Sequence, residues 1–161
     1  MIDKIKDKQK ELLNEIKVSC DRVSDINQEY LKEFKPDLFG NHKILENEEE
    51  RFFEMAEKLR AEAMKLADIS DRLLILRDEA LSVSDTLLSS KKSSDESDEL
   101  AKTLQRQAVT VSSFYDIIFE EYSRSIYAEI IKPVCNVGNI NRAMYGLSVK
   151  LKNLIFKITQ S

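Results

Sequence analysis

The sequence predicts an all-α fold, an elongated antiparallel helical bundle or coiled coil of three to four long helices. Turn residues are scarce, with three glycines and two prolines among 161 residues, and a β-rich domain of this size needs more. Charged residues make up 34% of the chain and apolar residues 42%, a mixture typical of long helices and coiled coils. The length suits one domain with a continuous core, so residues 1–161 are predicted to form a single helical-bundle domain.

The first predicted helix covers residues 2–34, where apolar residues follow a heptad. One column of this heptad consists of Ile2, Gln9, Ile16, Val23 and Tyr30, and the other consists of Ile5, Leu12, Ser19, Ile26 and Glu33. Such columns form the narrow apolar seam of a helix that packs against a partner helix. Pro36 disfavours helix at the residue before it and Gly40 supplies a turn, so the helix is expected to end near residue 34.

The second predicted helix, residues 44–88, has the most regular pattern in the chain. Its first apolar column consists of Leu45, Phe52, Leu59, Leu66, Leu73, Ala80 and Leu87. A second column, which Glu48 and Glu62 interrupt, consists of Met55, Ile69, Leu76 and Val83. At 1.5 Å per residue, a helix over this range spans roughly 67 Å. That length exceeds what a compact globule of this size can enclose, so the pattern predicts a rod.

A tip loop is predicted at residues 89–97, because serine, lysine and acidic residues replace every apolar side chain there. The return helix is predicted at residues 98–132, with Ser97 or Asp98 as its N-cap. Its apolar residues recur at eleven-residue spacing, in the sets Leu100, Val111, Tyr122; Leu104, Tyr115, Ile126; and Ala108, Phe119, Ile130. This period leaves a helix nearly straight, so the change of period between neighbouring helices predicts that the bundle bends or unwinds.

The last predicted helix covers residues 139–158, and a kink or break near Pro133–Gly138 separates it from the return helix. Its apolar seam consists of Ile140, Met144, Leu147, Leu151, Leu154 and Ile158. Further apolar surface beyond the seam comes from Val149, Ile155 and Phe156. The helix is therefore expected to be buried on more than one side, either by a second chain or by an elongated core.

Charge is unevenly distributed along the chain, whose net charge is −4. Residues 35–90 contain 8 basic and 13 acidic side chains, whereas residues 139–161 contain 4 basic and no acidic ones. The direct interpretation is that the basic last helix lies near the acidic second helix. Binding of an anionic surface by the last helix is the alternative.

The cysteines and the apolar runs indicate where in the cell the protein is located. Cys20 and Cys135 lie far apart and the N-terminus alternates charge, which predicts a reduced, cytoplasmic protein without a secretory signal. The longest apolar run, Leu73–Leu76, is far shorter than the ~20 residues that a membrane span needs. Any contact with a membrane is therefore expected to be peripheral.

No catalytic, cofactor or metal site is predicted, and the protein is not expected to be an enzyme. His42 is the only histidine and lies beside the Gly40 turn, so the Glu-x-x-His pairs of a di-iron bundle are absent. The two cysteines lack metal-ligand spacing and no glycine-rich phosphate loop occurs. Basic residues alternate with acidic ones before the last helix, whereas nucleic acid requires a continuous positive stripe, so nucleic-acid binding is not expected.

Three successive segments resemble the BAR-domain superfamily, and within it the BAR-like proteins of cilia. Residues 50–81, ERFFEMAEKLRAEAMKLADISDRLLILRDEAL, are similar to the long second helix of that family, and the polar tip at 89–97 follows them. Residues 100–134, LAKTLQRQAVTVSSFYDIIFEEYSRSIYAEIIKPV, resemble the return helix. The resemblance covers residues 45–155. It implies a three-helix antiparallel coiled coil that dimerises into a curved rod, lies on anionic membranes, and senses or shapes their curvature.

Two sets of residues are candidates for function. The candidate membrane contacts are Lys91, Lys92, Arg142, Lys150, Lys152 and Lys157. The candidate interface with a second copy or another helical protein consists of Ile140, Met144, Leu147, Leu151, Leu154, Ile155 and Ile158. A membrane-facing surface should be basic, and each well-placed cation contributes only ~1 kcal/mol. The acidic stretch 35–90 therefore leaves a second function open, that of a coiled-coil adaptor or structural subunit that binds a partner protein without lipid contact.

Overall fold

The computed structural model describes residues 2–34, 48–89 and 94–160, and the regular elements in these ranges are all helical. They are α1 (Ile2–Phe34), α2 (Glu49–Ser89), α3 (Asp95–Glu121), the π-helical segment η2 (Tyr122–Ile126), α4 (Tyr127–Ile130) and α5 (Val137–Gln160). The predicted all-α class is confirmed. With 41 residues, α2 is about 60 Å long.

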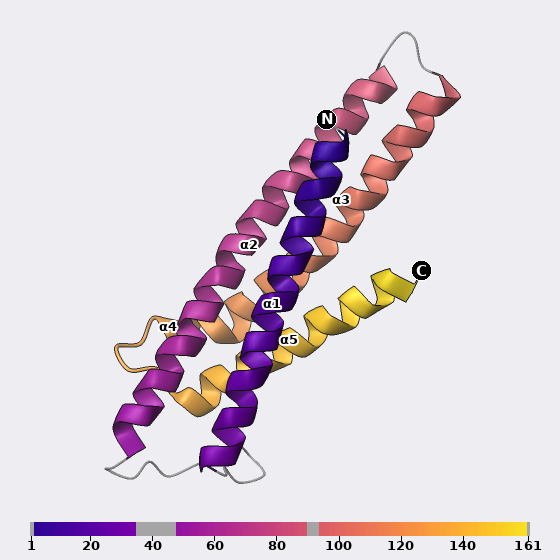
Figure 1. Ribbon diagram of the computed structural model, residues 1–161. Coiled ribbons are helices and arrows are strands. Elements are labelled where there is room, and N and C mark those ends of the chain that lie inside the picture. Colours follow the sequence, from indigo (N-terminus) through magenta and orange to yellow (C-terminus); the bar gives the residue numbers. More distant parts are fainter. Residues whose placement is uncertain (1, 35–47, 90–93, 161) are drawn as a thin grey trace.

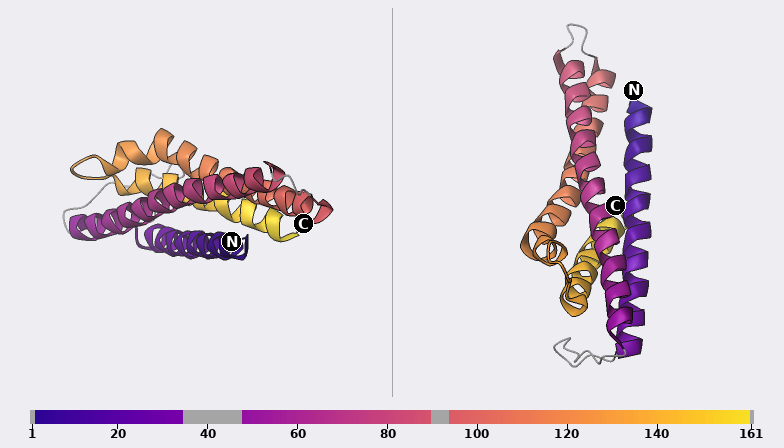
Figure 2. Two further views of the ribbon diagram at one scale, coloured as in Figure 1. Left: turned by 90° about the horizontal axis from the view of Figure 1, so that it is seen from above. Right: turned by 90° about the vertical axis from the view of Figure 1, so that its left-hand side faces the viewer.

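The long helices pack side by side around α2 (Figure 1). An antiparallel hairpin of α2 and α3 forms the longest part of the molecule, and α1 runs antiparallel to α2 along its flank, as both views in Figure 2 show. After the break that follows α4, α5 folds back and contacts α1, α2 and α3. In Figure 1, α5 is inclined to the hairpin and its C-terminal end points away from it.

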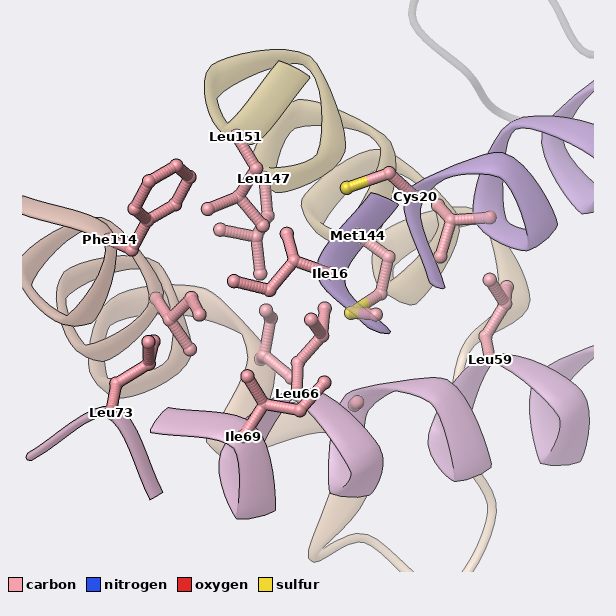
Figure 3. Packing of buried hydrophobic residues seen from close by; sticks show 14 of the residues in the cluster. Ile16, Cys20, Leu59, Leu66, Ile69, Leu73, Phe114, Met144, Leu147 and Leu151 are labelled. Carbon is pink, nitrogen blue, oxygen red and sulfur yellow. The ribbon is translucent and has the colours of Figure 1, made fainter. Parts of the chain in front are cut away.

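The core is one continuous apolar cluster to which all four long helices contribute. Ile16, Leu66, Phe114 and Leu147, one from each helix, are at most 1% exposed. Figure 3 shows such side chains pointing toward one another between the helices. Because interiors of this kind are close-packed, truncating one of these side chains to alanine costs roughly 2–5 kcal/mol.

The predicted heptad columns supply most of this core. In the first column of α2, Phe52, Leu59, Leu66, Leu73 and Ala80 are buried and Leu87 is half-buried. Leu45 lies outside the described residues. Two of the polar exceptions in the heptads of α1 and α2 contact each other, because the Ser19 hydroxyl donates a hydrogen bond of 2.8 Å to Glu62 Oε2. Both side chains are buried, so a polar pair between α1 and α2 replaces an apolar contact.

The start of the return helix differs from the prediction by three residues. Ser94 is the N-cap of α3, and its hydroxyl accepts a hydrogen bond from the Ser97 backbone N–H at 3.2 Å. Neither Ser97 nor Asp98 caps the helix; both lie in its first turn. Acidic residues in that turn, Asp95, Glu96 and Asp98, complement the positive end of the helix dipole and favour the earlier start. Lys91 and Lys92 of the predicted tip lie outside the described residues.

Further along, the return helix is not one uninterrupted α-helix. The eleven-residue pattern placed Phe119 on the buried stripe, but this side chain is exposed and the core uses Phe114 and Ile118 instead. A π-helical turn in η2 then adds a residue to the helix, with the Tyr127 N–H bonded to the Tyr122 carbonyl. The extra residue places Ile126 in line with Ile118, so that both are fully buried.

Pro133 ends the return helix rather than kinking it. α4 ends at Ile130 and α5 begins at Val137, two residues before the predicted start. Glu129 organises the turn between them: its carboxylate accepts hydrogen bonds from Lys132 Nζ at 2.7 Å, Asn139 Nδ2 at 3.0 Å and the Asn136 backbone N–H at 3.2 Å. Burial alone raises the pKa of Glu129, but these hydrogen bonds outweigh burial and hold the pKa below its usual range.

Candidate protein-interaction surfaces

The reactive side chains of the described residues do not gather into a metal site. Burial raises the pKa of the Cys20 thiol to about 12, an effect that nearby Lys152 only partly opposes, so this thiol is protonated at neutral pH. Burial also raises the pKa of Cys135. Across residues 2–34, 48–89 and 94–160, no three histidine, cysteine or acidic side chains converge as metal ligands. His42 lies outside the described residues.

The basic residues of the last helix do not converge on one surface. Lys150 forms an ion pair with Glu121 of α3, and Lys152 forms one of 3.2 Å with Asp21 of α1. These two lysines are two residues apart and therefore point about 200° apart around α5. The basic helix contacts the acidic α2, as the charge pattern predicted, but the ion pairs of these two lysines join it to α1 and α3. Arg142 and Lys157 are exposed.

Four residues of the predicted partner interface lie inside the chain's own core. Ile140, Met144, Leu147 and Leu151 are fully buried, and Figure 3 shows the last three pointing into the cluster between α1, α2 and α3. They are therefore not accessible to a partner in this conformation. The sequence left open whether a second chain or the chain's own core buries this helix, and these four residues are buried by the chain's own core. The remaining three, Leu154, Ile155 and Ile158, are half-buried at the C-terminal end of α5.

An apolar strip remains on the opposite side of α5. Tyr145, Val149 and Phe156 are 40%, 39% and 64% exposed, and their spacing places them within about 40° of one another around the helix. We call this strip the α5 outer face. The sequence pattern had already identified Val149 and Phe156 as apolar surface beyond the seam. It did not single out Tyr145, although the spacing from the predicted seam places this residue on the same face.

A second exposed apolar strip runs along α2. Phe53, Met64 and Ile75 are 54%, 60% and 59% exposed and lie eleven residues apart, so they form a nearly straight line on the helix surface. We call it the α2 outer face. The heptad columns concealed it, although the eleven-residue spacing was visible in the sequence. Single exposed apolar residues are ordinary in proteins, so it is only their alignment that makes this face a candidate interaction surface.

Shallow grooves lie between α1 and α2, beside the α2 outer face. One groove of about 590 Å³ is lined in part by Val18 and Met64, and a neighbouring one of about 250 Å³ includes Ile75. Arg72 lines both grooves and donates a 2.8 Å hydrogen bond to Glu15 across them. The grooves are thus apolar depressions edged by paired charges, which suits side chains of a packing helix better than a reacting substrate.

The protein is therefore all-α and has two exposed apolar strips, the α5 outer face and the α2 outer face. Comparisons of the chain with protein-family models, with curated proteins and with solved structures give no match. Among the described helices, not one combines the length and the apolar character that crossing a membrane requires.

Proposed function

We propose that this protein is a non-enzymatic helical adaptor or structural subunit that binds other proteins by packing its exposed helix faces against them. The α5 outer face carries the proposal: Tyr145, Val149 and Phe156 form an exposed apolar strip on a helix whose other side is buried as far as Leu151. Burying a large apolar side chain at an interface contributes roughly 1.5–3 kcal/mol, so a strip of three such residues suits a partner helix.

Internal ion pairing of the candidate lipid contacts supports protein binding over lipid binding. Lys150 and Lys152 are held by Glu121 and Asp21 on opposite flanks of α5. A cation near an anionic membrane contributes only ~1 kcal/mol, and an acidic partner beside it reduces that contribution further.

A membrane scaffold of the BAR-like kind is the second proposal. The long antiparallel hairpin of α2 and α3 supports it, since a rod of that length suits a surface of low curvature. In that case two copies would form the rod, and Arg142 and Lys157 would be its exposed cations among the described candidates.

Co-sedimentation with vesicles separates the two proposals. The test uses phosphatidylserine–phosphatidylcholine vesicles at low salt, with neutral vesicles as the control. We expect the protein to stay in the supernatant with both. Sedimentation with the anionic vesicles alone, lost in high salt and in the double variant Arg142→Glu/Lys157→Glu, would favour the membrane scaffold.

Site-specific photo-cross-linking tests protein binding directly. A benzophenone side chain replaces Phe156 in one variant and Val109, an exposed residue of α3, in a matched control. In extracts of the producing cells, we expect an adduct from position 156 that excess unmodified protein competes away, and no such adduct from position 109. Equal adducts from both positions, or none from either, would contradict the proposed function.

A further inference from the structure

A groove lies between α1 and α2 on the side of this helix pair that α5 does not cover. α5 meets α1 at Asn27, whose side chain accepts a hydrogen bond from Asn141, and beside Cys20. The groove of about 590 Å³ is lined by Val18 and Arg22, which are each two residues from Cys20 and therefore point about 200° away from it. Two packed helices leave a groove on each of their sides, and a further helix can pack into either one. α5 packs against one side of the pair, so the open groove is suited to a helix from outside the chain.

One end of this groove has an excess of positive charge. The carboxylate of Glu62 is buried at this end, and two cations share its Oε1 atom: Lys65 Nζ at 3.3 Å and Arg22 Nη1 at 3.5 Å. The other carboxylate oxygen accepts the hydrogen bond from Ser19. Two positive charges therefore face one negative charge, and both cations are about half exposed. An acidic side chain from a partner can contact both cations without displacing the buried carboxylate.

The other end of the groove has the opposite excess. Here two carboxylates share the guanidinium group of Arg72, that of Glu15 at 2.8 Å and that of Asp68 at 3.1 Å. The neighbouring groove of about 250 Å³ begins at the same arginine, and Glu11, one of its lining residues, forms no ion pair within residues 2–34, 48–89 and 94–160. This end therefore attracts a basic side chain.

The two charged ends lie about two helical turns apart. Lys65 and Arg72 are seven residues apart on α2, a distance of about 10 Å along the helix. Apart from the charged residues, the groove is lined mainly by apolar side chains, among them Val18, Met64 and Ile69. The three cations of the groove equal its three carboxylates in number, so the groove selects where a partner carries its charges rather than the partner's net charge.

We propose that this groove binds a helix of a partner protein that carries one acidic and one basic side chain seven residues apart, with apolar residues between them. Positions three, four and seven residues apart share one face of a helix, so the two charges and the apolar residues reach the groove together. The acidic side chain contacts Arg22 and Lys65, and the basic one contacts Glu15 and Asp68. This inference rests on the proposed function and adds the chemistry of a partner.

Three capped helical peptides test this charge pattern. One carries a glutamate and a lysine seven positions apart with two leucines between them, and the two controls carry two glutamates or two lysines at those positions. NMR of isotope-labelled methionine methyl groups locates the binding, because Met64 lines the groove and is 60% exposed, whereas Met55 and Met144 are fully buried. We expect the mixed-charge peptide to shift the Met64 resonance but not the other two, and to bind about fivefold more tightly than either control.

A single charge reversal should change which peptide binds most tightly. Asp68→Lys leaves more cations than carboxylates at both ends of the groove, so the peptide with two glutamates should become the tightest binder. Asp78→Lys is the matched control: both aspartates pair with an arginine at 3.1 Å and are 69% and 65% exposed, but Asp78 does not line this groove. The control should keep the original preference. Because the measured effect is a change of preference among peptides, a loss of stability does not imitate it.

Other outcomes overturn the inference. A Met64 resonance that stays in place at millimolar mixed-charge peptide, equal affinity for the three peptides, or the same effect from Asp68→Lys and Asp78→Lys would each do so. Failure here is distinguishable from failure of the proposed function: if no peptide enters the groove but the benzophenone at position 156 still joins another protein, the adaptor proposal stands and only this groove is not a binding site.

Discussion

At the scale of single residues, two buried hydrogen bonds fix how α1 sits against its neighbours. Ser19 joins Glu62 of α2, and Asn141 Nδ2 of α5 donates to Asn27 Oδ1 at 2.8 Å. Apolar contacts alone tolerate sliding of one helix along another, whereas a buried polar group is costly unless it meets its partner. The two bonds therefore specify the register of α1 against both helices.

Removing one partner of the Ser19–Glu62 pair should lower the free energy of unfolding more than removing both partners. Glu62→Ala leaves a buried hydroxyl without its acceptor, so we expect a loss of about 2–3 kcal/mol in the free energy of unfolding. The double variant Ser19→Ala/Glu62→Leu should recover most of that loss. Urea denaturation measures both values. Glu57→Ala, which breaks an exposed ion pair with Arg60, should cost less than about 1 kcal/mol; equal costs for Glu62 and Glu57 would refute the prediction.

The turn after α4 should weaken in acid. Because the folded state lowers the pKa of Glu129 below the ordinary 4.5, this carboxylate stabilises the fold above that pH and loses its effect as the pH falls through the lowered value. Glu129→Gln should therefore lower the melting temperature at pH 7. Below pH 4 the difference from the wild type should shrink, and thermal melts across this range measure it. A constant difference at every pH would show that charge is not the cause.

Cys20 should be unreactive while the protein is folded. Its pKa of about 12 keeps it a thiol, and burial blocks access by reagents. Iodoacetamide at pH 8 should modify Cys20 rapidly in denaturant and negligibly in buffer, which mass spectrometry of the digested protein can follow. Rapid modification in buffer would mean that α1 separates from α5 under native conditions.

At the scale of secondary-structure elements, the ends of helices were harder to predict than their interiors. The columns through Leu59, Leu66 and Leu73 are buried as the heptad predicts, because a repeat over several turns specifies one face. The start of α3 depends on one hydrogen bond at Ser94, and the separation of α4 from α5 depends on three at Glu129. Several polar residues nearby could have made such bonds, so the sequence does not select among them.

The N-terminus of α5 should depend on one amide side chain. Asn136 Oδ1 accepts a 2.9 Å hydrogen bond from the Asn139 N–H, which otherwise lacks a partner in the first turn. We expect Asn136→Ala to lower the free energy of unfolding by about 1 kcal/mol and Asn136→Asp to retain the cap. Chemical denaturation compares the three proteins. Equal losses in both variants would assign the effect to something other than capping.

At the scale of the whole molecule, the long helices make the protein elongated. A compact globule of 161 residues has a radius of gyration of about 15 Å. Since α2 alone is about 60 Å long, small-angle scattering at high dilution should give a clearly larger radius and an elongated distance distribution. A radius near 15 Å would show that the hairpin of α2 and α3 does not persist in solution.

The sequence by itself determined the all-α class, the long second helix and most core positions, because helical periodicity is a local property that each segment carries alone. Only the tertiary structure decided what covers the seam of α5. The pattern placed Leu147 on that seam and Val149 beyond it, but it allowed either a second chain or the chain's own core to bury the seam. The choice came from α1, α2 and α3 closing over one side together, and it left Tyr145, Val149 and Phe156 at the surface.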